Sequence, residues 1–388
     1  MDVTRADFLL DPAVCFLNHG SYGACPAEVF AAYQDWQRKL EWQPVAFCDP
    51  AAQTSMNRAV REALGSFLNA DPADLVGVVN APEALSIVLL GLDLAPGDEI
   101  VTTDHEYGAM NKTLEVLCAR SGAVVRRVAV PLPMVSEDAF ADAVLAAFTG
   151  RTRVLFLSHI TSPTALLFPL ERVLAGARAR GVLSVIDGAH GPGQVALDLT
   201  ALGADVYAGN CHKWLMSPKG AGFLHMARRL QQDVTPRIVS HGWQAEGGGP
   251  YTGSTLLDRI EMQGTRDRAA WFTVPKALEW RRARNWESVI ARCRDLVSRT
   301  AERVAEMSGY APLSSEEFRA PQMAAMEIPA GDMPALHDRL LREFGIEMPA
   351  ILWNGRCFLR LSVAAYTTEA DCDHLVASLG RVFRWRSA

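Results

Sequence analysis

Several features that define other protein classes are missing from this chain of 388 residues. There is no uncharged run of about 18 apolar residues, the length that a membrane-spanning helix needs. There is no block of Lys and Arg, and the formal net charge is −6, so neither nucleic acid nor an anionic membrane is an expected partner. The first residues, MDVTRADFLLDPAVCF, place acids ahead of any apolar stretch and do not resemble a signal peptide. These absences favour a cytoplasmic protein.

Paired cysteines are missing as well. The eight cysteines are scattered, none forms a CxxC pair, and none stands with histidines at metal-ligand spacing. We therefore expect reduced thiols and no metal site.

The pattern that is present indicates an α/β fold. Apolar residues make up 49% of the chain and charged residues 21%, the balance of a globular protein with a sizeable core. Short apolar runs alternate with helical segments such as 140–148 and 169–181, after two helical stretches at 27–43 and 51–70. Such alternation predicts a mostly parallel sheet with helices on both faces. The runs are LVGVVN, EIVTTD, VVRRVAV, RVLFLSH, VLSVID, ADVYAGN and GFLHMA.

The pattern changes after about residue 265. Residues 266–307 form a long helical stretch, and shorter strands (QMAAMEI and CFLRLSV) and a closing helix near 369–385 follow. We predict an N-terminal segment (1–25), a large domain (26–264) and a smaller α+β C-terminal domain (265–388), joined by a long helix.

Polar residues stand at the ends of several predicted strands. In open α/β sheets, ligands bind outside the carboxyl ends of the strands. Lys213 follows one of these ends among small and aromatic neighbours, and desolvation there would free its amine for imine formation. The strand-end residues are Asn80, Asp104, His159, Asp187 and Asn210.

Lys213 and Asp187 together suggest a cofactor. Alone, each has an ordinary structural use, a surface lysine or an aspartate that caps a helix. Pyridoxal phosphate, however, needs both an amine to hold its aldehyde and a carboxylate to keep its pyridine nitrogen protonated. It also needs a phosphate cradle, for which the Asn80 strand end and Asn210 with His212 are candidates.

Seven ordered motifs carry a family resemblance. The chain resembles pyridoxal-phosphate enzymes of fold type I, in the class V aminotransferase superfamily, and within it the isopenicillin N epimerase-like branch. The motifs are FLNHGSYGACP (16–26), TTDHEYGAM (102–110), SHITSPTALLFPL (158–170), VIDGAHGPG (185–193), GNCHKWLMSPKGAGFL (209–224), QGTRD (263–267) and RLSVAAYTT (360–368).

The resemblance implies roles in holding the cofactor. Lys213 would bind the aldehyde and act as base and acid at the substrate α-carbon, and Asp187 would pair with the pyridine nitrogen. His105 stands where the family stacks an aromatic ring over the cofactor, and His190 and His159 would approach its phenolic oxygen. Asn210 and His212 would bind the phosphate.

It also implies substrate and subunit contacts. Arg360 would grip the substrate α-carboxylate, a task suited to its planar fork. Asn18, in the N-terminal segment, would line the mouth of the site. Thr265 would reach the phosphate of a neighbouring subunit, which makes a homodimer with shared active sites the expected assembly.

The sequence departs from the family at two places. The loop after the first strand usually offers a Thr hydroxyl and consecutive amides to phosphate, but here it reads NAPEA, and Pro82 has neither hydroxyl nor N–H. The amides of Ala81 and Glu83 remain as candidates. The stretch FGIEMPAILWNG contains no cysteine, and Cys357 lies within an apparent strand, so a persulfide-forming desulfurase is disfavoured.

Three reactions at an amino-acid α-carbon remain open. Racemisation or epimerisation is the leading hypothesis, with Lys213 serving one face and a group near His105 or Tyr107 the other. A carbon–sulfur lyase that eliminates a β- or γ-substituent is the alternative, and transamination comes third. A binding module without catalysis is the remaining hypothesis.

Overall fold

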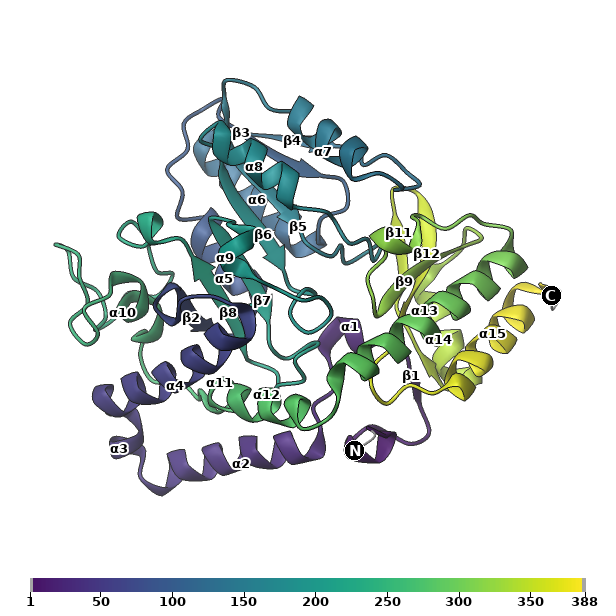
Figure 1. Cartoon of the computed structure of the whole chain (residues 1–388), viewed down its shortest axis with the longest axis horizontal. Helices are drawn as coiled ribbons and strands as arrows, with labels where there is room; N and C mark the ends of the chain where they lie inside the picture. Colours follow the sequence, from purple (N-terminus) through teal and green to yellow (C-terminus); the bar gives the residue numbers. More distant parts are fainter. Residues whose placement is uncertain (1–2, 386–388) are drawn as a thin grey trace.

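The computed structural model describes residues 3–385, which contain three sheets, of seven, three and two strands. Figure 1 shows a larger part around a long twisted sheet and a smaller part that carries the C-terminus. Residues 1–2 and 386–388, the outermost parts of the first and last predicted segments, lie outside the described residues.

The larger sheet has seven strands and is mostly parallel, as predicted. Only β8 runs against its neighbours, β2 and β7. Each strand corresponds to one of the seven apolar runs of the sequence. In sheet order the strands are β2 (Leu75–Val78), β8 (Gly222–Met226), β7 (Val206–Asn210), β6 (Leu183–Gly188), β5 (Thr152–Ser158), β3 (Glu99–Thr103) and β4 (Val124–Val128).

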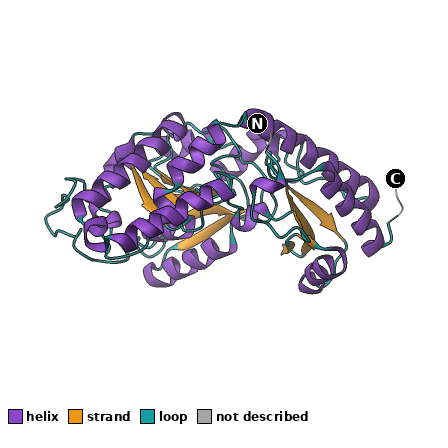
Figure 2. Ribbon diagram, turned by 90° about the horizontal axis from the view of Figure 1, so that it is seen from below, coloured by secondary structure: helices purple, strands orange, loops and turns teal. Residues whose placement is uncertain are grey.

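Hydrophobic cores lie on both faces of this sheet, because central strands of a parallel sheet are buried on both sides. In β5, Val154 and Phe156 pack into one core while Leu155 and Leu157 pack into the other. Figure 2 shows the strands between layers of helices. One core takes side chains from α5 (Ala81–Leu89), α6 (Gly108–Ser121) and α10 (Thr255–Glu261), and the other from α4 (Pro50–Leu68), α7 (Glu137–Ala146) and α8 (Glu171–Ala179).

The remaining helices of the larger part lie at its periphery. α2 (Ala27–Trp42) leads through α3 (Pro44–Cys48) into α4, and α9 (Leu199–Leu202) precedes β7.

The smaller part is built on an antiparallel sheet of three strands in the order β11-β12-β9. A separate pair, β1 (Cys15–Phe16) and β10 (Ile346–Glu347), joins the N-terminal segment to this part. The other elements are β9 (Met323–Ile328), β11 (Ala350–Trp353), β12 (Arg356–Ser362), α13 (Trp286–Ser308), α14 (Met333–Phe344) and α15 (Glu369–Phe383).

The long helical stretch at 266–307 is three helices rather than one. α11 (Ala269–Phe272) and α12 (Val274–Arg282) end before α13 begins. Pro275 lacks an N–H and is accommodated in the first turn of α12, which separates that helix from α11. Because α11 and α12 pack on α2 and α4, they add to the core of the larger part. The predicted boundary at 265 therefore precedes two helices that pack on the larger part.

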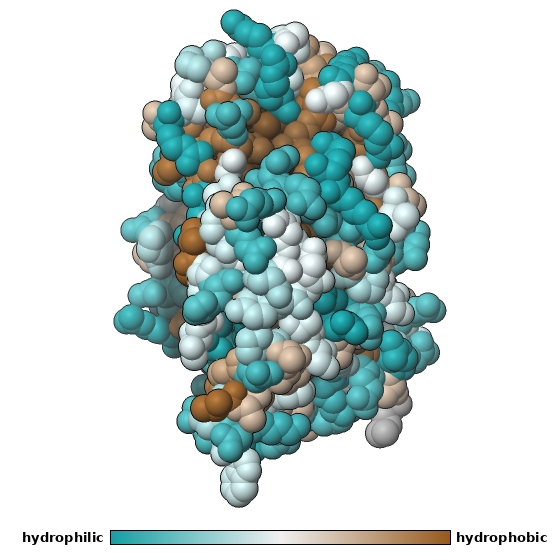
Figure 3. Space-filling view, turned by 90° about the vertical axis from the view of Figure 1, so that its left-hand side faces the viewer, coloured by the Kyte–Doolittle hydropathy of each residue, from teal (hydrophilic) through white to brown (hydrophobic). Residues whose placement is uncertain are grey.

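The surface carries hydrophobic residues among hydrophilic ones. Figure 3 shows the face at the left of Figure 1, where hydrophobic residues gather in the upper part. None of the helices in residues 3–385 is long and apolar enough to span a bilayer.

Candidate active site

A cavity of about 220 Å³ lies at the carboxyl ends of the parallel strands. The larger sheet contributes the ends of β5, β6 and β7, the smaller part contributes Arg360 from β12, and the N-terminal segment contributes α1 (His19–Tyr22). Of the predicted site residues, eight line this cavity. They are Asn80, Tyr107, Asp187, His190, Asn210, His212, Lys213 and Arg360.

Asp187 is buried and Lys213 is half-buried in this cavity, and the pKa values of both are shifted. Burial, with the nearby Arg360 guanidinium, lowers the pKa of Lys213 to about 7, so its amine loses its proton readily. Burial raises the pKa of Asp187, whose Oδ1 accepts a 2.9 Å hydrogen bond from the Ala189 N–H. A cationic N–H placed beside Asp187 would relieve the cost of its buried charge.

Arg360 is a buried guanidinium without a carboxylate partner among the described residues. Its Nη1 donates to the backbone oxygen of Ser162 at 2.7 Å, and its Nη2 donates to Ser21 Oγ at 3.1 Å. Its Nε has no hydrogen-bond partner in residues 3–385. A buried cation held only by neutral groups is suited to bind an anion such as a carboxylate.

The backbone amides that the sequence suggested as phosphate donors already have other hydrogen-bond partners. The amides of Ala81 and Glu83 are already bonded, at 2.9 Å each, to Asn210 Oδ1 and Asn80 Oδ1. Pro82 lines the cavity and offers no N–H. The first turn of α5 therefore has no free backbone amide for phosphate. The side-chain donors that remain at this end of the cavity are the carboxamide nitrogens of Asn80 and Asn210, and His212.

His105 does not line the cavity. Its ring is fully buried against Trp353, with centroids 4.2 Å apart, and its Nδ1 lies 2.7 Å from Thr164 Oγ1. Tyr107, two residues later, does line the cavity. Of these two residues, Tyr107 therefore reaches the cavity and His105, to which the resemblance gives the stacking role, does not.

His159 points away from the cavity, although Ser158 lines it. The His159 ring lies beside Tyr207, 3.0 Å from its hydroxyl, and lines a separate cavity of about 420 Å³. Successive residues of a strand point to opposite faces, so a shift of one residue changes which side chain meets the ligand.

Asn18 and Thr265 also lie outside the cavity lining. Asn18 donates from Nδ2 to Glu347 Oε1 at 2.8 Å, and its neighbours Gly20, Ser21 and Tyr22 line the cavity instead. Thr265 lines another cavity, of about 160 Å³, next to Arg266 and Arg268.

Sequence reasoning missed the buried carboxyl of Glu106. It accepts hydrogen bonds from the Ser158 N–H at 2.8 Å and from the Thr103 hydroxyl at 2.7 Å, and burial raises its pKa to about 7. The sequence feature that could have identified Glu106 is its position next to Tyr107 in the TTDHEYGAM motif. Glu106 fixes Ser158, which lines the cavity. The other lining residues that the sequence analysis did not name individually are Gly20, Ser21, Tyr22, Ile160, Ser162 and Ala189.

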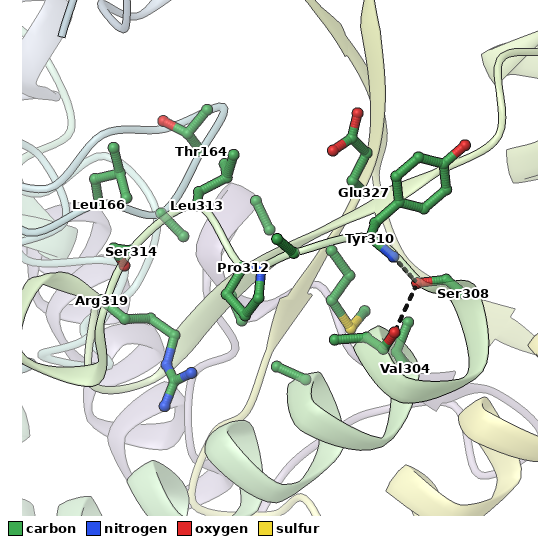
Figure 4. A pocket seen from close by; sticks show the side chains of 17 residues that line it. Thr164, Leu166, Val304, Ser308, Tyr310, Pro312, Leu313, Ser314, Arg319 and Glu327 are labelled. Carbon is green, nitrogen blue, oxygen red and sulfur yellow. Dashed lines mark hydrogen bonds between the residues drawn. The ribbon is translucent and has the colours of Figure 1, made fainter. Parts of the chain in front are cut away.

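A smaller cavity of about 40 Å³ lies between the 164–166 segment and the elements α13 and β9. Figure 4 shows Thr164 and Leu166 on one side of it and Val304 and Glu327 on the other. Neither Lys213 nor Asp187 lines this cavity, so the chemistry belongs to the 220 Å³ cavity.

The profile of the family "Aminotransferase class-V" matches residues 24–375. The chain belongs to the class V aminotransferase family. The predicted family resemblance is therefore confirmed, and with it the conclusion that this protein is an enzyme.

Relatives within this class V family catalyse different reactions. The chain is 36% identical to isopenicillin N epimerase from Amycolatopsis lactamdurans, over 97% of this chain and 96% of that one. It is 31% identical to putative L-cysteine desulfhydrase 1 from Oryza sativa subsp. japonica, over 91% and 76%.

Solved structures show the same fold. The cystine C–S lyase C-DES, in complex with cysteine persulfide, superposes with a TM-score of 0.81 at 24% identity, over 94% of this chain and 97% of that one. The cysteine desulfurase CsdA from Escherichia coli gives 0.81 at 24%, over 98% and 97%. The predicted type I fold is confirmed.

The predicted cofactor, pyridoxal phosphate, is confirmed by the class V family. The cavity fits it, because one wall offers the amine of Lys213 and another the free Oδ2 side of Asp187. Cys357 is buried in the core of the smaller part, as expected for a packing residue.

Proposed function

We propose that this chain is a pyridoxal-phosphate-dependent epimerase or racemase that inverts the α-carbon of an amino acid. The convergence of Lys213, Asp187 and Arg360 on one 220 Å³ cavity carries this proposal. The identity of 36% to isopenicillin N epimerase over nearly the whole chain supports inversion as the outcome.

Arg360, Asp187 and Lys213 have separate roles in the proposed reaction. Arg360 holds the substrate α-carboxylate and thereby fixes which bond of the α-carbon is presented for cleavage. The bound cofactor supplies an electron sink for that carbon, which Asp187 maintains by keeping the ring nitrogen protonated. Lys213 takes the α-proton on one face, because burial lowers the pKa of its amine to about 7 and so makes the unprotonated form accessible near neutral pH.

Inversion requires a proton donor on the second face. Tyr107 is a candidate, since it lines the cavity, carries an ionisable hydroxyl and lies close enough to Arg360 to influence its charge. A Tyr107→Phe variant removes the hydroxyl and keeps the ring, so it should retain cofactor binding and exchange of the α-proton but lose inversion.

Incubation of amino acids in D₂O tests the reaction. An epimerase incorporates deuterium at the α-carbon while the optical rotation decays to zero for a substrate with one centre. Release of a keto acid with ammonia or thiol, with no inverted product, would contradict inversion and establish elimination. Stoichiometric conversion of the cofactor to its amine form would establish transamination. Lys213→Ala is the control that should give none of these.

A carbon–sulfur lyase is the second candidate. The 31% identity to an L-cysteine desulfhydrase favours it, and elimination begins with the same removal of the α-proton. The same assay with L-cysteine and L-cystine as substrates tests this candidate. Release of sulfide from L-cysteine or of persulfide from L-cystine would establish elimination.

We also propose a homodimer with shared active sites, located in the cytoplasm. Thr265 lies outside the cavity lined by Lys213 of its own chain, which supports its use by a partner. Exposed apolar side chains on α2, α3 and the 231–254 segment supply surface for an interface; they include Trp42, Val45, Ile238 and Val239.

A mixing experiment tests the shared site. Thr265→Glu should prevent phosphate binding by charge repulsion, and Lys213→Ala should prevent covalent attachment. Co-refolded chains of the two variants restore activity if the Thr265 of one chain completes the site of the other. Absence of activity in purified mixed dimers, or a monomeric mass in light scattering, would contradict the proposal.

A further inference from the structure

His190 lies between Trp214 and Lys213, within hydrogen-bond distance of both. The Trp214 indole nitrogen donates to His190 Nδ1 at 3.3 Å, and His190 Nε2 lies 3.1 Å from Lys213 Nζ. Both rings are buried. The indole N–H can only donate, so Nδ1 must be the unprotonated acceptor, and the neutral imidazole carries its proton on Nε2. That proton then points at the nitrogen of Lys213.

The surroundings keep this imidazole neutral. Burial lowers the pKa of His190 well below its usual value, and the positive charges of Lys213 and Arg360 act in the same direction. A second proton on Nδ1 would also face the indole N–H, a contact between two donors. The Asp187 carboxylate acts on Lys213, where its negative charge raises the pKa of the amine and opposes the effect of burial.

Trp214 is held in place from two directions. Its backbone oxygen accepts a hydrogen bond from Arg281 Nη1, and its ring packs against His19 with centroids 4.8 Å apart. The indole N–H is therefore aimed by packing and does not depend on His190 for its direction.

We propose that Trp214 is a positioning residue that fixes the tautomer of His190, so that His190 donates its Nε2 proton to the reacting nitrogen of Lys213. This donation favours the unprotonated nitrogen, the form that attacks the cofactor aldehyde and takes the α-proton. The inference deepens the proposed function and rests on it for the role of Lys213.

Trp214→Phe tests the inference, since it removes the N–H and keeps an aromatic ring. Without the indole donor, Nδ1 can take the proton and Nε2 can accept from a protonated Lys213 nitrogen. The pH midpoint of the visible absorption band of the cofactor-loaded protein should then rise by about 0.5–1 pH unit, the size expected for one hydrogen bond. Trp286→Phe is the matched control, because the buried Trp286 indole N–H has no partner among residues 3–385, and its midpoint should not move.

A double-mutant cycle separates positioning from packing. In a His190→Gln background, Trp214→Phe should no longer shift the midpoint, because Trp214 acts through His190. An equal shift in both backgrounds, or no shift in folded Trp214→Phe protein, would overturn the inference.

Histidine-selective ¹⁵N spectra of the wild-type protein provide a readout that needs no Trp214 variant and no activity. The resonance lost in His190→Gln should show a proton on Nε2 and none on Nδ1 between about pH 6 and 9, with or without cofactor. A proton on Nδ1 would overturn the inference. An Nε2 proton in a protein without epimerase activity would leave the inference intact and refute the proposed reaction.

Discussion

His19 donates its Nε2 proton to the backbone oxygen of Lys213 at a distance of 3.0 Å. The carbonyl can only accept, so the neutral ring offers Nδ1 to the hydroxyl of Tyr366, also 3.0 Å away. One buried side chain thus connects the N-terminal segment, the smaller part of the molecule and the segment that carries the reactive amine.

Replacement of His19 by Ala should destabilise the protein by about 2–4 kcal/mol, because it empties buried volume and leaves the Tyr366 hydroxyl without a partner. Urea denaturation measures this loss. Tyr366→Phe removes one hydrogen bond without a cavity and should cost about 1 kcal/mol. Equal losses for both variants would mean that the ring of His19 contributes no packing.

Gly23 should not tolerate a side chain. Its φ is +72°, and a Cβ there would overlap the backbone oxygen of His212. We expect Gly23→Ala to lower the thermal midpoint and weaken cofactor binding, since the residue next to Lys213 must move. Gly108→Ala, which meets no atom within 4 Å, is the matched control and should leave both unchanged.

Acid should destabilise the protein between about pH 6.5 and 4. Burial lowers the pKa of His19 to about 3 and those of His159 and His212 to about 4, so these rings stay neutral in the folded protein while the unfolded chain takes up protons below its ordinary pKa of about 6.5. The contribution of these neutral histidines to the free energy of unfolding is therefore fully present above pH 6.5 and is lost as the pH falls toward their folded-state pKa values.

Unfolding free energies measured from about pH 7.5 to 4.5 should show net proton uptake on unfolding. Glu106, whose pKa is raised to about 7 by burial, opposes this trend by up to one proton. His159→Gln should reduce the slope by about one proton near pH 5. A stability that is flat across this range would contradict the prediction.

Arg360→Lys should lower kcat/KM by about 100-fold, since a lysine keeps the charge but loses the two-pronged grip on the substrate carboxylate. The effect should appear mainly in KM for the amino acid, with the visible band of the cofactor unchanged. Arg356→Lys, on the same strand but paired with Glu327, serves as control and should act as wild type. A loss of the visible band would indicate damage to the cofactor site.

Lys213→Ala should remain folded and lose the covalent link to the cofactor. Borohydride treatment followed by mass spectrometry of the intact chain measures that link. A cofactor adduct that survives in this variant would show that another lysine carries the aldehyde.

The sequence was a good guide to the fold, because residues buried on both faces of a sheet leave continuous apolar runs. Lys213 and Asp187 stood out in the sequence as charged residues that follow apolar runs, and both line the 220 Å³ cavity. The errors at the site have a common physical origin. His159 and Ser158 are adjacent, and only the pleat of β5 decides which one meets the ligand.

His105 and Tyr107 present the same difficulty beyond the end of β3, where the chain turns into α6 and strand alternation no longer applies. Trp353 packs on His105 and donates a hydrogen bond to the backbone oxygen of Asp104, a residue 249 positions away from it in the chain. No local sequence pattern predicts such a contact. The bonded amides of Ala81 and Glu83 likewise depend in part on Asn210, a residue from a different strand.

The hairpin of β11 and β12 has a consequence for how substrate reaches the cavity. Trp353 and Asn354 at its tip both bind Asp104 of the larger part, at 2.8 Å each. These two hydrogen bonds connect the smaller part to the larger part. Both would have to break before the β11–β12 hairpin could move away from Asp104. We therefore expect amino acids to enter and leave the cavity past Tyr22 and Tyr107, the two exposed tyrosines of its lining. The size of these two side chains would then limit which substrates can enter.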